Sequence, residues 1–153
     1  MAAARSIGVP ELAGVGSYKE ALKIGLSVEE NVRRLVRFHW VEQRLAAIVV
    51  ARIAETPEWE VKGAFALHQY LDIEHASSLA ARIRELRHPA PRLDTPPDEA
   101  LELFLQEVEQ AQDTVELLAG VYRVARADLA TAYRMHIDLE DHDSPRCRRA
   151  DHR

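Results

Sequence analysis

The sequence predicts an all-α protein, an antiparallel up-and-down helical bundle, and three observations support this class. Residues that favour helices, above all Ala, Leu, Glu and Arg, are abundant, whereas glycine occurs only 6 times in 153 residues. Apolar residues recur three or four positions apart over residues 28–55, 57–87 and 98–140, the spacing of one helix face. A short connection joins the first two segments, so we expect them to pack antiparallel.

Capping signals set the expected boundaries of the first two long helices. Ser27 and Glu30 form a capping box, which predicts a helix over about residues 27–55. Thr56 as N-cap and Pro57 at the first helical position predict that a second helix starts at once and continues to about residue 87. A short helix over residues 18–24 is expected upstream.

Prolines mark the one clear linker, residues 88–98, with the sequence HPAPRLDTPPD. The segment after it contains one glycine, Gly120, and we favour a turn or sharp bend near it that divides residues 98–140 into two helices. An unbroken helix remains the alternative, because an apolar face keeps its spacing through Gly120, with Leu101, Phe104, Val108, Ala111, Val115, Leu118, Tyr122, Ala125, Leu129 and Ala132. The expected organisation is therefore a single domain, with an N-terminal arm (1–26), the bundle (27–140) and a polar tail (141–153).

Composition and charge exclude several classes of function. The formal net charge is -5 and basic residues are interspersed with acidic ones, which argues against nucleic-acid binding. No signal-like or membrane-spanning apolar stretch is apparent, so we expect a cytoplasmic protein without membrane association. The single cysteine, Cys147, has no partner for an internal disulfide.

Ionisable residues interrupt the apolar faces of the first two predicted helices at matching heights. His39 and Glu42 lie in the first face, and His68, Asp72 and His75 lie in the second. Antiparallel packing should bring the two groups together in the interior. Burying such groups without compensation costs several kcal/mol, so they should either pair with one another or bind a cation.

The spacing and chemistry of these residues favour a metal site. His39 with Glu42, and Asp72 with His75, are pairs three residues apart that project from one helix face. Carboxylate and imidazole ligands suit iron, manganese or zinc. Glu74, one step around the second helix, is a further candidate as a ligand, a supporting residue or an outward charge. The alternative is a set of core histidines with an Asp72–His75 salt bridge and no metal.

The C-terminal half of the chain mostly lacks this signature. Glu102, Glu109, Asp113 and Glu116 form a stripe beside the apolar face, and we assign them to solvent. His136, with Tyr133 three residues before it, is the one plausible contribution from this half to the polar cluster.

The residues of the first two helices resemble the ferritin-like superfamily of carboxylate-bridged di-iron proteins, which carry a glutamate on one helix and Glu-x-x-His on the next. Over residues 28–87 the resemblance makes Glu42 the first-helix ligand, and Asp72 with His75, in DIEH, the second-helix motif with Asp in place of Glu. The fourth-helix motif is not matched, since Tyr133 stands where an acid is expected in YRMH.

This resemblance implies a non-haem iron oxidoreductase, di-iron or mononuclear, that acts on a small organic substrate. The alternative is a non-catalytic helical protein, either a metal store or a protein-interaction module, whose polar residues lock the helices in register. We also expect a homodimer, because apolar residues surround the helix over residues 57–87 on nearly all sides.

Overall fold

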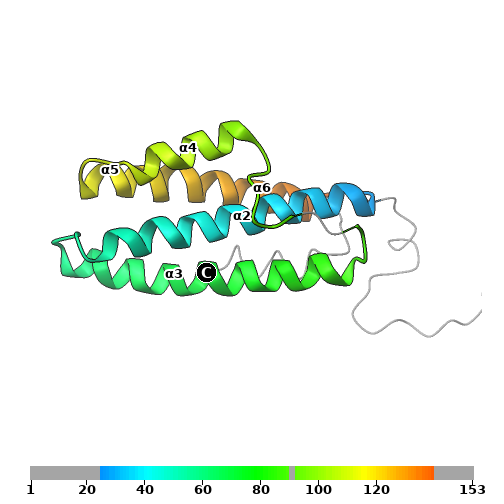
Figure 1. Ribbon diagram of the computed structural model, residues 1–153, viewed down its shortest axis with the longest axis horizontal. Helices are drawn as coiled ribbons and strands as arrows, with labels where there is room; N and C mark the ends of the chain where they lie inside the picture. Colours follow the sequence, from blue (N-terminus) through cyan, green and yellow to red (C-terminus); the bar gives the residue numbers. More distant parts are fainter. Residues whose placement is uncertain (1–24, 90–91, 140–153) are drawn as a thin grey trace, which may run out of the picture.

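The computed structural model describes residues 25–89 and 92–139, and these residues form an all-α structure without a strand (Figure 1). The elements in chain order are α2 (Val28–Ile53), α3 (Trp59–Glu85), α4 (Glu99–Glu109), α5 (Thr114–Leu118), the π-helix η1 (Ala119–Ala125) and α6 (Arg126–Asp138). The predicted all-α class is confirmed. The short helix expected over residues 18–24 and the polar tail expected over 141–153 lie outside the described residues.

The start of α2 follows the predicted capping signal. The Ser27 hydroxyl oxygen accepts a hydrogen bond from the Glu30 backbone N–H at 3.2 Å. The Glu30 carboxylate accepts from Arg33 and Arg34, each at 2.8 Å, on the helix surface. Ser27 therefore caps the helix as expected, and Glu30 adds ion pairs along its first turns.

The start of α3 differs from the prediction. Thr56 is not its N-cap, because the Thr56 hydroxyl donates to the Arg52 carbonyl at 2.8 Å and thereby completes the end of α2. Glu58 occupies the N-cap position, and Trp59 is the first helical residue. The Arg52 carbonyl thus accepts from both the backbone N–H and the hydroxyl of Thr56, so Thr56 belongs to the end of α2 and not to the start of α3.

The break in the C-terminal half lies at residues 110–113 and not near Gly120. Asp113 caps α5, where its Oδ1 accepts from the Glu116 backbone N–H at 2.8 Å. The helix then continues through Gly120 without a turn. Both expectations for residues 98–140, a turn at Gly120 and one unbroken helix, are therefore wrong, because an Asp cap can start a helix where no glycine or proline marks the boundary.

Gly120 serves the packing of helices. A Cβ atom at this position would lie 3.0 Å from both methyl groups of Val108 on α4. The absence of a side chain thus lets α4 approach η1 closely.

The π-helix shifts which residues face the interior. Buried positions from α5 to α6 are spaced by four residues, at Leu117, Val121, Ala125, Leu129 and Tyr133. In an α-helix, residues four apart point in directions that differ by about 40°, so a face with this spacing turns around the helix. A π turn is wider and holds one more residue. Here the Arg126 backbone N–H donates to the Val121 carbonyl, five residues earlier. Of the predicted apolar face, Ala125 and Leu129 are buried as expected. Leu117 and Val121 are buried in place of Leu118 and Tyr122, and Val115 is 76% exposed.

The acidic stripe is not wholly solvated, contrary to expectation. Arg44 on α2 pairs with Glu109 at 2.8 Å and approaches Glu102 at 3.8 Å. Asp113 caps α5, and Glu116 accepts from the Gln112 backbone N–H at 2.6 Å. These carboxylates therefore tie α4 to α2 and shape the turn before α5.

Helix α3 contacts η1 and α6 directly, through His68 with Tyr122 and Asp72 with Arg126. Helix α2 runs alongside α3, and α4 and α6 lie on its other side in the view of Figure 1. Its buried residues include Leu35, Leu45, Ile48 and Val49, each at most 1% exposed, and all belong to one core cluster with residues of every other described helix. None of the described helices combines the length and apolarity that a membrane crossing requires. His39 and Glu42, in the middle of α2, are therefore polar residues that lie in a dry interior.

Candidate metal centre

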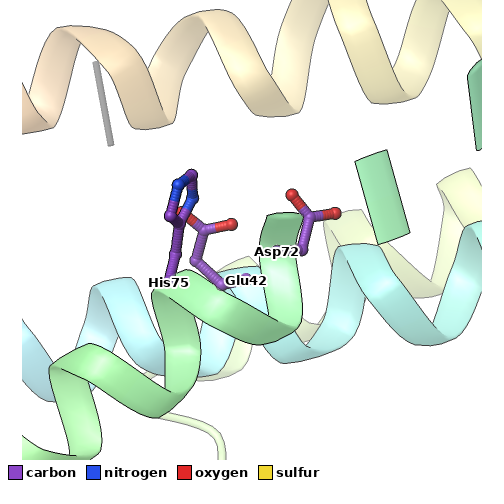
Figure 2. A group of neighbouring side chains, drawn as sticks. All are labelled: Glu42, Asp72 and His75. Atoms are coloured by element: carbon purple, nitrogen blue, oxygen red, sulfur yellow. The ribbon is translucent and has the colours of Figure 1, made fainter. Parts of the chain in front are cut away.

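Helices α2 and α3 bring three of the predicted ligands together in the interior (Figure 2). Glu42 comes from α2, and Asp72 and His75 come from α3, one turn apart. Each offers one ligand atom, and these atoms all lie within 4.8 Å of one another. Glu42 is 2% exposed and Asp72 0%, whereas His75 is half-buried.

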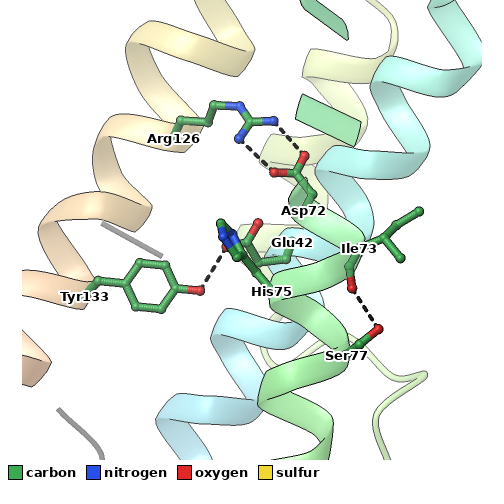
Figure 3. Close-up of polar contacts among 7 residues, drawn as sticks. All are labelled: Glu42, Asp72, Ile73, His75, Ser77, Arg126 and Tyr133. Atoms are coloured by element: carbon green, nitrogen blue, oxygen red, sulfur yellow. Dashed lines mark hydrogen bonds and ion pairs between the residues drawn. The ribbon is translucent and has the colours of Figure 1, made fainter. Parts of the chain in front are cut away.

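Glu42 is held by neighbours from two other helices (Figure 3). Its Oε1 accepts a hydrogen bond from the Tyr133 hydroxyl of α6 at 2.9 Å and lies 3.2 Å from His75 Nδ1. The Tyr133 ring packs against Phe38 with 4.6 Å between ring centroids. These contacts fix one orientation of the Glu42 carboxylate in the core.

Asp72 has a cationic partner on α6 (Figure 3). Arg126 donates from its two terminal nitrogens to the two oxygens of Asp72, at 2.8 and 2.6 Å. Burial raises the pKa of Asp72 to about 6, against the lowering effect of Arg126, and the nearby Glu42 carboxylate adds to the rise. Desolvation thus outweighs the ion pair at this site.

His68 contributes to the surroundings of Arg126 and lies outside the three-residue group. Its Nδ1 is 2.6 Å from the Tyr122 hydroxyl, and the Arg126 guanidinium lies over the Tyr122 ring at 5.3 Å from the centroid. Burial, with a smaller effect of Arg126, lowers the pKa of His68. The neutral His68 ring can therefore form a hydrogen bond with the Tyr122 hydroxyl, while the Tyr122 ring lies against the Arg126 guanidinium.

The other two candidates also lie outside the group. His39 is buried on α2, and burial lowers its pKa, which favours the neutral ring. Glu74 is exposed on α3, the outward position that was one of its three expected roles. Three of the predicted residues, Glu42, Asp72 and His75, are therefore brought together, and His39, His68 and Glu74 are not.

Two residues of this network, Arg126 and Tyr122, were not expected from the sequence. Tyr133 was expected as a contribution of the C-terminal half, and His136 beside it is fully buried, at 5.6 Å from the Phe38 ring centroid. A signal for Arg126 was present, since it precedes Tyr133 by seven residues, two turns of an α-helix. From the sequence, an arginine two turns before the inward Tyr133 could have been predicted to lie on the same face and to form an ion pair with Asp72.

The donor set fits one metal ion and not two. Ligands at 2.0–2.2 Å from a common ion are separated by at most about 4.3 Å, so separations within 4.8 Å need only small side-chain movements. His75 Nε2 is buried without a hydrogen-bond partner among the described residues, and it is thus a ready donor. A di-iron site of the bundle type uses four carboxylates and two histidines, whereas this cluster has two carboxylates and one histidine.

Arg126 opposes this fit at one ligand. Both Asp72 oxygens accept from its guanidinium, so an ion would have to share Asp72 with Arg126 or displace it. Glu42 accepts from the Tyr133 hydroxyl and lies 3.2 Å from His75 Nδ1, so neither ligand is paired with a guanidinium among the described contacts.

These features define an all-helical protein with a carboxylate–histidine cluster buried between two long helices. Comparison of the chain with protein-family models, with curated proteins and with solved structures gives no match in any of the three.

Proposed function

We propose that the chain is a metal-binding protein of the ferritin-like type, an antiparallel up-and-down bundle in which Glu42, His75 and Asp72 hold one divalent cation. The observation that carries the proposal is the convergence of three ligand atoms from α2 and α3 within 4.8 Å in the interior. Iron is the first candidate, and manganese and zinc also suit oxygen and imidazole donors.

The chemistry that fits this site best is that of a non-haem iron oxidoreductase with a small organic substrate. Three protein ligands leave coordination positions for other molecules, and iron supplies redox chemistry when bound. The chain itself supplies orientation, because Tyr133 donates to Glu42 Oε1 at 2.9 Å and so limits how that carboxylate can turn. A mononuclear site agrees with the donor set better than a di-iron site does.

Metal titration of matched variants tests the proposal. The metal-free protein should bind about one Fe²⁺, Mn²⁺ or Zn²⁺ per chain in calorimetry and elemental analysis. Glu42→Gln and His75→Gln should each lower the affinity by 10-fold or more, because each removes one ligand. Glu74→Gln is the matched control: it removes an exposed carboxylate of the same helix and should leave affinity unchanged.

Two results would contradict the proposal. One is a parent protein that binds no ion while its circular dichroism shows a folded helical chain. The other is a Glu74→Gln variant that loses as much affinity as Glu42→Gln, since binding would then reflect surface carboxylates in general.

A second function, a polar lock that fixes helix register in a non-catalytic metal store or interaction module, is favoured by one observation. Arg126 satisfies both oxygens of Asp72, and Tyr133 and His75 contact Glu42, so the cluster has internal partners. For a pure lock, added metal should not shift the melting temperature. For a metal site, stabilisation should grow with the logarithm of metal concentration.

A further inference from the structure

An apolar cavity lies beside the candidate metal centre, between α2, α4, η1 and α6. Its volume is about 190 Å³. Phe38 and Val41 of α2, Leu101, Phe104 and Leu105 of α4, and Leu129 of α6 form most of its wall. The two charged side chains that line it, Arg37 and Asp128, belong to residues exposed to solvent, so the charge lies on its outer side.

The size and lining of this cavity indicate which kind of molecule it can bind. An engineered apolar cavity of about 150 Å³ stays dry and binds benzene, and a water molecule needs two to four polar partners. The cavity of about 190 Å³ is partly open to solvent, and its apolar inner wall suits an apolar molecule about the size of benzene or slightly larger. Arg37 already pairs with Asp98, which weakens its use as an anchor for an anionic ligand.

We propose that this cavity binds a small apolar molecule, of the size of one substituted aromatic ring or a short alkyl chain. Burial of the apolar surface of such a ligand supplies the binding free energy. A polar substituent would face the outer side, where Arg37 and Asp128 lie.

The cavity is linked to the candidate metal centre through one aromatic ring. Phe38 lines the cavity, and its ring also packs against Tyr133 with centroids 4.6 Å apart. Tyr133 in turn donates to Glu42. A bound molecule would thus be separated from Tyr133 by the Phe38 ring alone. That this molecule belongs to the substrate class of the oxidoreductase rests on the proposed function, whereas the binding of the molecule does not.

Binding is tested on the full-length protein in EDTA, with toluene as the probe and methyl NMR of leucine and alanine as the readout. Ring currents should shift the Leu101, Leu105, Leu129 and Ala132 methyl signals in a saturable way. Ala132→Phe should abolish these shifts, because it fills the cavity that Ala132 lines. Ala127→Phe is the matched control on the exposed side of α6 and should retain them.

A second variant keeps the test decisive if Ala132→Phe fails to fold. Phe104→Ala enlarges the same cavity and should admit naphthalene at least 10-fold more tightly than the parent does. The inference is overturned if toluene causes no saturable shifts in the parent, or if Phe104→Ala and the parent bind naphthalene equally.

Failure of this inference can be told apart from failure of the proposed function. Glu42→Gln should lose metal and keep toluene binding, and Ala132→Phe should lose toluene and keep metal. Loss of both ligands in each single variant would mean that the two sites are not separate, and it would overturn the assignment of the cavity as a binding site of its own.

Discussion

Arg126 donates to both oxygens of Asp72, at 2.8 and 2.6 Å, in the interior between α6 and α3. The Asp72 side chain is 1% exposed and that of Arg126 is 22% exposed, so the pair is largely dry. A bidentate guanidinium satisfies a carboxylate as fully as one cation can. The pair and a bound metal are therefore alternatives for Asp72, and Arg126 is the residue whose replacement distinguishes them.

Arg126→Met should destabilise the metal-free protein by about 3–5 kcal/mol, because it leaves Asp72 buried without its partner. Urea unfolding in EDTA measures this loss. Added Mn²⁺ or Zn²⁺ should then raise the melting temperature of the variant more than that of the parent, since the metal no longer competes with a guanidinium.

Arg123→Met is the matched control for this change. Arg123 is exposed on η1, three residues before Arg126, so its replacement should alter stability by less than about 0.5 kcal/mol. Equal effects of the two substitutions would show that the Arg126–Asp72 pair contributes no more than a surface charge.

The ionisation of Asp72 should oppose folding as the pH rises. Burial raises the pKa of Asp72 from 3.8 to about 6, so the folded state holds the proton more tightly than the unfolded state does. This group's favourable contribution is complete below pH 3.8 and is lost as the pH rises through about 6. Other groups add their own pH dependence, so a variant comparison is needed to isolate Asp72.

Urea unfolding at pH 4, 5, 6 and 7 in EDTA makes this comparison for the parent and Asp72→Asn. Relative to the variant, the parent should lose on the order of 2 kcal/mol between pH 4 and 7. Parallel stability curves for the two proteins, or a parent that gains stability relative to the variant, would contradict the assigned direction.

Periodicity and capping identified the parts of the site that lie on regular helices. Ser27 starts α2, and the spacing of His39 and Glu42 against Asp72 and His75 predicted that two polar groups would meet in the interior. Glu42, Asp72 and His75 do meet, because a short connection between two long helices leaves one way to bury both faces. His39 and His68 share these faces but lie outside the three-residue group, and His68 contacts the Tyr122 hydroxyl instead.

Of the partners from the C-terminal half, Tyr133 was expected, whereas Arg126 could not be found in the same way. An α-helical period predicted Leu118, Tyr122 and Ala132 on the inward apolar face, whereas Leu117, Val121 and Tyr133 are the buried residues beside them. The buried residues of α5, η1 and α6 are spaced four apart, which is compatible with a π turn. Apolar residues four apart also occur over short stretches of α-helices, so the sequence alone did not predict the π turn.

The homodimer expected from the sequence stays a prediction, and exposed apolar residues on α3 make it testable. Leu67, Tyr70 and Ile73 are 56%, 57% and 46% exposed and lie on neighbouring turns. Light scattering after size exclusion should show a dimer that dissociates on dilution. Leu67→Lys should raise the dissociation constant 10-fold or more, because it places a charge in this patch.

Val50→Lys is the control for the dimer experiment, since Val50 is 50% exposed and belongs to a different helix, α2. It should leave the dissociation constant unchanged. A strictly monomeric parent at all concentrations would refute the dimer.

Two glycines in helices should respond in opposite ways to alanine. At Gly63 on α3, a Cβ would meet nothing within 4 Å, so Gly63→Ala should gain roughly 0.5–1 kcal/mol from helix propensity. At Gly120 on η1, the same gain is opposed by contacts of 3.0 Å with two Val108 methyl groups. Overpacking of this kind costs about 1–3 kcal/mol, so Gly120→Ala should destabilise the protein.

The double variant Gly120→Ala with Val108→Ala separates propensity from packing. Removal of the two Val108 methyl groups relieves the contact, so Gly120→Ala should be less harmful in the Val108→Ala background than in the parent. Thermal and urea unfolding of the four proteins of this cycle measure the coupling. A Gly120→Ala penalty that is unchanged by Val108→Ala would show that α4 does not depend on this glycine for its approach to η1.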